Sequence, residues 1–288
     1  MKRVQLSVFA GLLATILLPA VSHAQEGRYG LFNLLDSRSK YGQNWFPEPL
    51  NTDEMDADQE LRLNYSHFEG DGVRSDEASG EVEMRFGEQG LLTLELEVPW
   101  EHESERSDGV TDNTDGFGPF EISARHPFFQ FVSNDGWFDY TLGGNAELAI
   151  ASGSDVSKNS EVVAGLFQTI GFGEHLNLQT RVAYSRLLGP GDANGEAVLE
   201  YAGVLGYNVE LPEPFFRVTP IFEIDGETGL NHGESGTTVL DGVVGFDLCF
   251  DAIKVGQPKL LLGYVFPLNG NARDEFDWGI VCSALIEF

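Results

Sequence analysis

From residue 59 to the end of the chain, apolar and polar side chains alternate with a period of two. The clearest stretch is residues 92–100, where leucine, valine and tryptophan take the even positions and threonine, glutamate and proline the odd ones. A period of two puts alternate side chains on opposite faces of a β-strand, so each stretch predicts a strand with one apolar face. We count about twelve such strands, each of about nine to fifteen residues. The alternation of the second becomes visible at Glu81, after a polar loop, and the last, residues 276–288, begins with Phe276 on its apolar face.

The connections between the predicted strands alternate in kind. Those after odd-numbered strands are polar or rich in glycine, and residues 101–118 are expected to form a long charged loop. Those after even-numbered strands are mostly tighter, as at residues 87–90, or marked by aromatic residues and prolines, as at 212–214. An even strand number with short turns at one end and long loops at the other is typical of an antiparallel up-and-down barrel. We expect residues 276–288 to pair with residues 59–68 and close the ring.

The last predicted strand ends on Phe288, on its apolar face. Here the chain resembles the outer-membrane β-barrel class of Gram-negative bacteria, whose closing strand typically ends in phenylalanine and is recognised by the insertion machinery. The resemblance implies an all-β transmembrane barrel in the cell outer membrane, with membrane lipids and that machinery as partners. A soluble β-sandwich or barrel is the alternative, but aromatic residues gather at strand ends as two membrane girdles require. The predicted girdle residues are Phe86, Trp100, Phe128, Phe138, Tyr184, Phe216, Tyr264, Trp278 and Phe288.

The first 58 residues do not alternate. Residues 1–24 have a basic start, an apolar run and a small residue before Gln25, which is typical of a cleavable secretory signal peptide. Residues 25–58 contain prolines and an acidic run, so we expect an irregular N-terminal arm. Two interpretations of this arm stay open: a periplasmic tail, or a small plug that enters the barrel. The barrel itself is expected to span residues 59–288.

The chain carries a formal net charge of -29. Such a balance argues against nucleic acid as a partner, because phosphates are bound by lysine and arginine, and it favours cations near the protein. The two cysteines, Cys249 and Cys282, fall on strands two apart with opposite facing. That geometry predicts no disulfide between them.

The polar faces of the predicted strands point into the barrel. A ring of about twelve strands is wider than the eight whose side chains fill the interior, so the lumen must hold water, a plug or ion pairs. Basic residues that recur among acidic ones suggest either a structural ion-pair network or a wet path that favours cations. The predicted lumen-lining residues are Arg62, Arg85, Arg125, Arg181, Arg217, Lys259, Glu83, Glu95, Glu97, Glu121, Glu147, Glu223 and Asp241.

One short stretch suggests catalysis. His102 and Ser104, two residues apart at the end of the third strand, resemble the His and Ser of the outer-membrane phospholipases, which also use twelve-stranded barrels. That family orients its histidine with an asparagine on the following strand, and the strand expected next, residues 120–127, contains none. We therefore expect no enzymatic activity. The remaining histidines, His67, His126, His175 and His232, stand singly without metal-ligand spacing, so we also expect no metal and no cofactor.

Residues 116–125 carry a second resemblance. They are similar to a Gly-x-Gly-Asp segment and following strand in the barrel family named for the meta-pathway of phenol degradation, although Pro119 replaces the aspartate. The resemblance implies an outer-membrane transport protein, and its substrate class is not carried over. The function that we expect is passive passage of a small-molecule solute through an acidic lumen. The alternatives are a structural or cation-binding barrel with a closed lumen, and a lipid hydrolase.

Overall fold

The computed structural model describes residues 46–52, 55, 59–70, 72–86, 92–107, 110–133, 137–189, 195–231, 235–253 and 255–288. The predicted signal peptide, most of the N-terminal arm and the turn at 87–90 lie outside these residues. Twelve long strands make up most of the described chain: β1 (Glu60–Gly70), β2 (Val73–Phe86), β3 (Leu92–Ser107), β5 (Phe120–Val132), β6 (Phe138–Ile150), β7 (Ser160–Phe172), β8 (Leu176–Leu188), β9 (Ala197–Tyr207), β11 (Phe215–Gly229), β12 (Thr238–Phe250), β13 (Gln257–Pro267) and β14 (Trp278–Glu287). The shorter elements are β4 (Val110–Phe117), β10 (Val209–Glu210) and the helix α2 (Gly270–Glu275).

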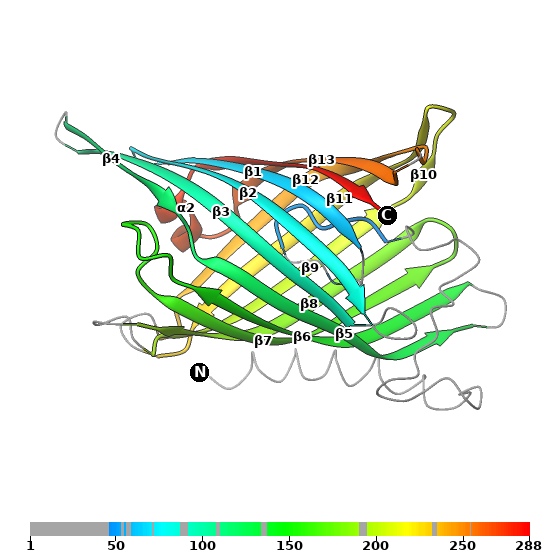
Figure 1. The fold of residues 1–288 in the computed structure, drawn as a ribbon, viewed down its shortest axis with the longest axis horizontal. Helices are drawn as coiled ribbons and strands as arrows, with labels where there is room; N and C mark the ends of the chain where they lie inside the picture. Colours follow the sequence, from blue (N-terminus) through cyan, green and yellow to red (C-terminus); the bar gives the residue numbers. More distant parts are fainter. Residues whose placement is uncertain are drawn as a thin grey trace.

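The twelve long strands form a closed antiparallel barrel (Figure 1). Each pairs with its neighbours along the chain, with β3 joined to β5 and β9 joined to β11. The ring closes where β14 pairs with β1, in a register that runs from Glu60 opposite Glu287 to Glu69 opposite Trp278. The predicted fold class, strand number and closure are confirmed. We call the end where β1 begins and β14 ends the terminal end, and the end that carries α2 the distal end.

The outer surface of the barrel is apolar. Outward side chains such as Leu63 (63% exposed) and Phe288 (57% exposed) alternate with buried inward ones along the strands. Rows of exposed hydrocarbon around a closed barrel are suited to lipid and unsuited to water. The protein is therefore a barrel of the cell outer membrane. Among the described residues, no helix has the length and apolar character to cross a membrane.

The predicted girdle residues lie on this outer surface or near its ends. Six are exposed and three are half-buried. The exposed ones are Phe86, Trp100, Tyr184, Phe216, Tyr264 and Phe288, and the half-buried ones are Phe128, Phe138 and Trp278. Their depth relative to lipid headgroups stays a prediction.

Three local expectations were wrong. Residues 101–118 do not form a loop, because β3 continues to Ser107 and returns as β4 in a hairpin at the distal end (Figure 1). The second strand begins at Val73, eight residues before the alternation becomes visible at Glu81. In both places the strand is polar on both faces, so hydrogen bonding to the neighbour persists without an apolar row to reveal it.

The third error concerns the start of the last strand. Phe276 was expected on the outer face of that strand, but it follows α2 and is 7% exposed, with its ring 5.3 Å from that of Phe68. The helix begins at an N-cap, Asn269, whose side chain accepts a hydrogen bond from the amide of Ala272 at 2.9 Å. The helix therefore displaces Phe276 from the alternating pattern.

Candidate functional site

Part of the N-terminal arm lies inside the barrel. We call residues 46–52 together with Met55 the lumen segment; Figure 1 draws it in blue within the ring of strands. Its residues are mostly buried, and Met55 has no exposed surface. They are the described part of the arm, and the choice between a periplasmic tail and a plug for residues 25–58 stays a prediction. Three kinds of contact hold the segment to the barrel wall.

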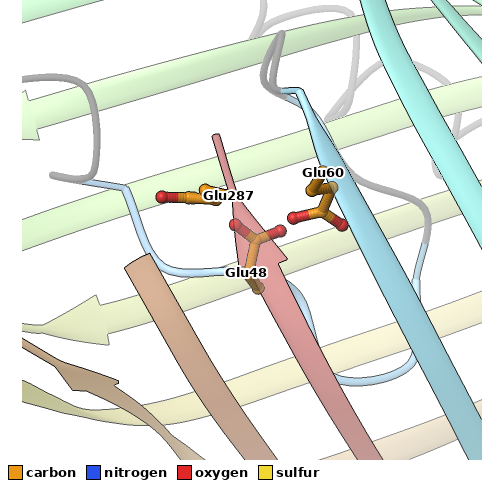
Figure 2. Close-up of side chains that lie close together, drawn as sticks. All are labelled: Glu48, Glu60 and Glu287. Carbon is orange, nitrogen blue, oxygen red and sulfur yellow. The ribbon is translucent and has the colours of Figure 1, made fainter. Parts of the chain in front are cut away.

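The first contact is an ion-pair latch around Glu48. Its carboxylate lies 2.5 Å from Nη2 of Arg62 on β1 and 2.6 Å from Nζ of Lys259 on β13. Arg62 also contacts Glu60 at 2.7 Å, and Lys259 pairs with Glu287. Figure 2 shows Glu48, Glu60 and Glu287 converging from the lumen segment, β1 and β14. The latch thus joins the segment to the seam where the barrel closes.

Glu48 remains ionised in this setting. Burial raises the pKa of its carboxyl group, but the charges of Lys259 and Arg62 together outweigh burial and lower the pKa to about 2. A charged carboxylate with two basic partners makes stronger hydrogen bonds than a neutral one. The latch therefore persists at neutral pH.

The second contact is a backbone clamp made by Glu223 on β11. Its carboxylate accepts hydrogen bonds from the amides of Leu50 at 2.9 Å, Thr52 at 2.6 Å and Asn51 at 3.3 Å. Beside it, the side chain of Asn51 donates to Asp225 at 3.1 Å. One fully buried carboxylate thus satisfies three consecutive amides that have no strand partner.

The third contact is an apolar pocket for Leu50. It belongs to a buried cluster that includes Val243, Leu261 and Val265. Gly245 leaves room for the Leu50 side chain, because a Cβ added at Gly245 would lie only 2.8 Å from Cδ1 of Leu50. Burying a leucine side chain stabilises its position by about 1.5–3 kcal/mol, so this pocket adds to the two polar contacts.

All thirteen predicted lumen-lining residues lie on the inner face. Several are paired there: Arg125 with Glu83 and, at 3.4 Å, with Glu95; Arg181 with Glu200 at 3.2 Å; and Arg217 with Asp247 at 3.0 Å. The buried members are Arg62, Arg125, Arg181, Arg217, Lys259, Glu83 and Glu223, and the half-buried ones are Arg85, Glu95, Glu97, Glu121, Glu147 and Asp241. Whether these residues select a solute is a separate question.

Basic and acidic side chains gather at different positions along the barrel axis. Five basic residues lie close to the terminal end: Arg62, Arg85, Arg125, Arg217 and Lys259. Distal to the lumen segment lie two cavities of about 310 and 300 Å³, which share Asn51, Thr52 and Glu121. We call these two cavities the acidic chamber.

The lining of the acidic chamber is dominated by carboxylates. Ten acidic side chains line it against three arginines. The acidic residues are Glu77, Glu81, Glu95, Glu97, Glu121, Glu147, Glu161, Glu200, Asp225 and Glu227, and the arginines are Arg62, Arg125 and Arg181. Carboxylic side chains thus outnumber basic ones in this lining.

Three groups of carboxylates lie close enough to share a metal ion. In the group Glu48, Glu60 and Glu287, the positive charge is already supplied by Arg62 and Lys259. The other two groups, which share Glu81, also border on the arginines of the wall. The expected absence of a metal and of a cofactor therefore stays a prediction.

Sequence reasoning missed the main contacts of the lumen segment. Glu48, Gln179 and Glu287 were not among the candidates, although Gln179 donates to the carbonyl of Pro47 at 2.6 Å. Glu287 could have been found, since it falls on the inner row of the last strand. Glu48 carries no local signal, because its partners are far away in the chain.

The His102 and Ser104 pair lies on the outer face of β3. The His102 ring stacks against Trp100 at 6.3 Å, and no hydrogen bond joins His102 to Ser104 among the described side chains. The strand that follows in the chain is β4, not residues 120–127, and its Asn113 stands in register with Ser104. The expectation that the next strand lacks an asparagine was therefore wrong, but His102 shows no orienting hydrogen bond in the described part of the chain.

Comparison with known proteins agrees with the fold. No protein-family model and no curated protein matches this chain. A crystal structure of an outer membrane channel from Pseudomonas putida F1 is similar, with a TM-score of 0.56 at 11% identity, over 84% of this chain and 99% of that chain. The NanC porin follows, with a TM-score of 0.47 at 12% identity over 80% of this chain and 99% of that one. A KdgM porin in complex with disordered oligogalacturonate has a TM-score of 0.45 at 14% identity, over 79% of this chain and 99% of that chain. The likeness to the Pseudomonas putida channel, at 11% identity, shows the β-barrel fold alone. The resemblance to the phenol-degradation family stays a prediction.

Proposed function

We propose that this protein is an outer-membrane channel for small molecules, closed at rest by its own lumen segment and selective for cations. The observation that carries the proposal is the acidic chamber, in which ten carboxylates face three arginines and which ends on Asn51 and Thr52. Two cavities lined by unbalanced charge are expected of a path for cations, and a sealed structural barrel has no need of them.

The mechanism is passive. A cation that enters the chamber gains from carboxylates on several strands at once, and an anion is repelled because the protein wall screens charge less than water does. At the lumen segment the path is blocked by the Glu48 latch, the Glu223 clamp and the Leu50 pocket. Passage requires these contacts to break or the segment to move aside.

Planar-bilayer recording tests the proposal. The full-length variant Glu48→Gln/Leu50→Ala, which weakens the latch and the pocket together, is compared with the unmodified protein. We expect rare openings for the unmodified protein and frequent openings for the variant, with a reversal potential in a salt gradient that reports preference for the cation. A variant that conducts anions at least as well as cations would refute the selectivity.

A second candidate is a structural barrel with a permanently closed lumen, favoured by the dense ion pairs at the terminal end. If the folded double variant still conducts no current, the result would favour the structural barrel over the channel. In either case the proposed partners are outer-membrane lipids around the apolar rows and the insertion machinery at the last strand, which ends on outward-facing Phe288.

A further inference from the structure

We infer that the inner wall around the lumen segment is a binding site for short, carboxylate-bearing peptides, and that residues 46–52 are its resident ligand. The inference deepens the proposed function, on which it rests, by naming a class of solute: short peptides whose acidic side chain is balanced by an ammonium group, so that the cation-selective chamber does not repel them. The wall holds the segment mainly through groups that any extended peptide carries.

The wall recognises four features of the segment. Arg62 and Lys259 hold a carboxylate, and Glu223 accepts three backbone amides. The side chain of Gln179 donates to a backbone carbonyl at 2.6 Å. Val243, Leu261 and Val265 enclose an aliphatic side chain. Within six consecutive residues, the wall thus contacts backbone donors, a backbone acceptor, an acidic side chain and an apolar side chain.

The barrel fixes these wall groups independently of the segment. They come from β1, β8, β11, β12 and β13, whose positions are set by the register of the closed ring. Arg62 is also held by Glu60, and Lys259 by Glu287, so both basic groups keep a partner on the wall when the segment leaves. A site whose groups are held in place loses little conformational entropy on binding a ligand.

The charges on the wall limit which ligands can bind there. A polycation would be repelled where Arg62 and Lys259 lie, and a polyanion would be repelled by Glu223 and the acidic chamber. An uncharged sugar would supply no carboxylate to replace the contacts that Glu48 makes with the two basic groups. A short peptide that carries one acidic group, and amide or ammonium donors farther along, satisfies both ends of the site. Such a peptide would compete with the lumen segment for the same wall.

The test measures binding of a synthetic, fluorescently labelled peptide with the sequence of residues 46–52, by anisotropy in detergent. The receptor is the full-length Glu48→Gln/Leu50→Ala variant, whose own segment is weakened. We expect saturable binding, at least tenfold weaker binding of the peptide with glutamine in place of its glutamate, and similar weakening when Glu223→Gln is added to the receptor. Adding Glu275→Gln, which removes a charge from α2 at the distal end and lies outside both cavities, is expected to leave affinity unchanged.

The unmodified protein should bind the peptide more weakly than the variant, because its own segment occupies the site. Equal binding of the native, glutamine-containing and scrambled peptides would overturn the inference, as would an absence of saturable binding. If the double variant lacks the heat-modifiable gel migration of a folded barrel, the single variant Glu48→Gln takes its place. Peptide binding without current would refute the channel proposal and leave this inference standing. Cation-selective current without peptide binding would refute this inference and leave the channel proposal standing.

Discussion

Glu223 is the wall residue whose replacement tests the closed state most selectively. Its carboxylate is fully buried and accepts the amides of Leu50, Asn51 and Thr52. Glu223→Gln keeps the size of the side chain but removes its charge and turns one of its two oxygens into a donor. The amide group then faces backbone N–H groups that it can no longer fully satisfy.

The size of the effect follows from these contacts. Hydrogen bonds to a charged group contribute about 1.5–3 kcal/mol each, and the bonds to Leu50 and Thr52 are the two short ones. Glutamine retains one acceptor, so we expect a net loss of about 3 kcal/mol from the closed state, or about a hundredfold in the ratio of open to closed channels. The barrel should unfold at no lower temperature, because the substitution also removes a buried charge.

Single-channel recording of Glu223→Gln measures this ratio directly. The matched control is Glu227→Gln, which removes the same charge from the same strand and lines the chamber. We expect frequent openings in the first variant and the resting behaviour of the unmodified protein in the second. Equal open probability in both variants would show that lumen charge, and not the clamp, governs opening.

Three further outcomes are expected. Glu121→Gln, at a position shared by both cavities, should lower the preference for cations in an opened channel, measured as a smaller reversal potential; an unchanged potential would contradict the role of the chamber. The pKa of Glu48 lies below its ordinary value of 4.5, at about 2, so the latch is fully stabilising above about pH 4.5 and weakens only as the pH falls toward 2; in the Glu223→Gln variant, whose clamp carries no carboxyl group, acidification from about pH 7 to about pH 5 should therefore not increase the openings, and an increase in that range would count against the latch. Purified protein should show no calcium-dependent lipase activity, because His102 lacks an orienting hydrogen bond among the described residues; activity that Ser104→Ala abolishes would revive the hydrolase alternative.

The barrel could be predicted because lipid imposes a simple rule on the sequence. Where a strand crosses hydrocarbon, every second side chain must be apolar, and the alternation in residues 92–100 follows from that requirement. The inner position of Lys259 and of Glu223 follows from the same rule. Beyond the membrane the rule lapses, so the hairpin of β3 and β4 carries charges on both faces and was mistaken for a loop.

The site itself could be predicted only in part. The period of two assigns Arg62, Lys259 and Glu223 to the inner wall, but it says nothing about what they contact. Their partner segment lies outside the alternating region, and Glu48 is 211 residues from Lys259 in the chain. Contacts of this kind arise from the closure of the ring, which brings β13, β14 and β1 together. No local pattern encodes them.

The account depends most on the claim that residues 46–52 lie in the lumen and close it. Asn51→Cys/Asp225→Cys, in a chain with Cys249→Ala and Cys282→Ala, tests that claim, because Nδ2 of Asn51 and Oδ2 of Asp225 lie 3.1 Å apart, which puts the two thiols within reach of a short bis-methanethiosulfonate cross-linker. The reagent should join the two cysteines in nearly all molecules and abolish current, and reduction should restore the openings of the parent chain. A cross-link that does not form, or a fully cross-linked channel that still conducts at the level of the Glu48→Gln/Leu50→Ala variant, would contradict it.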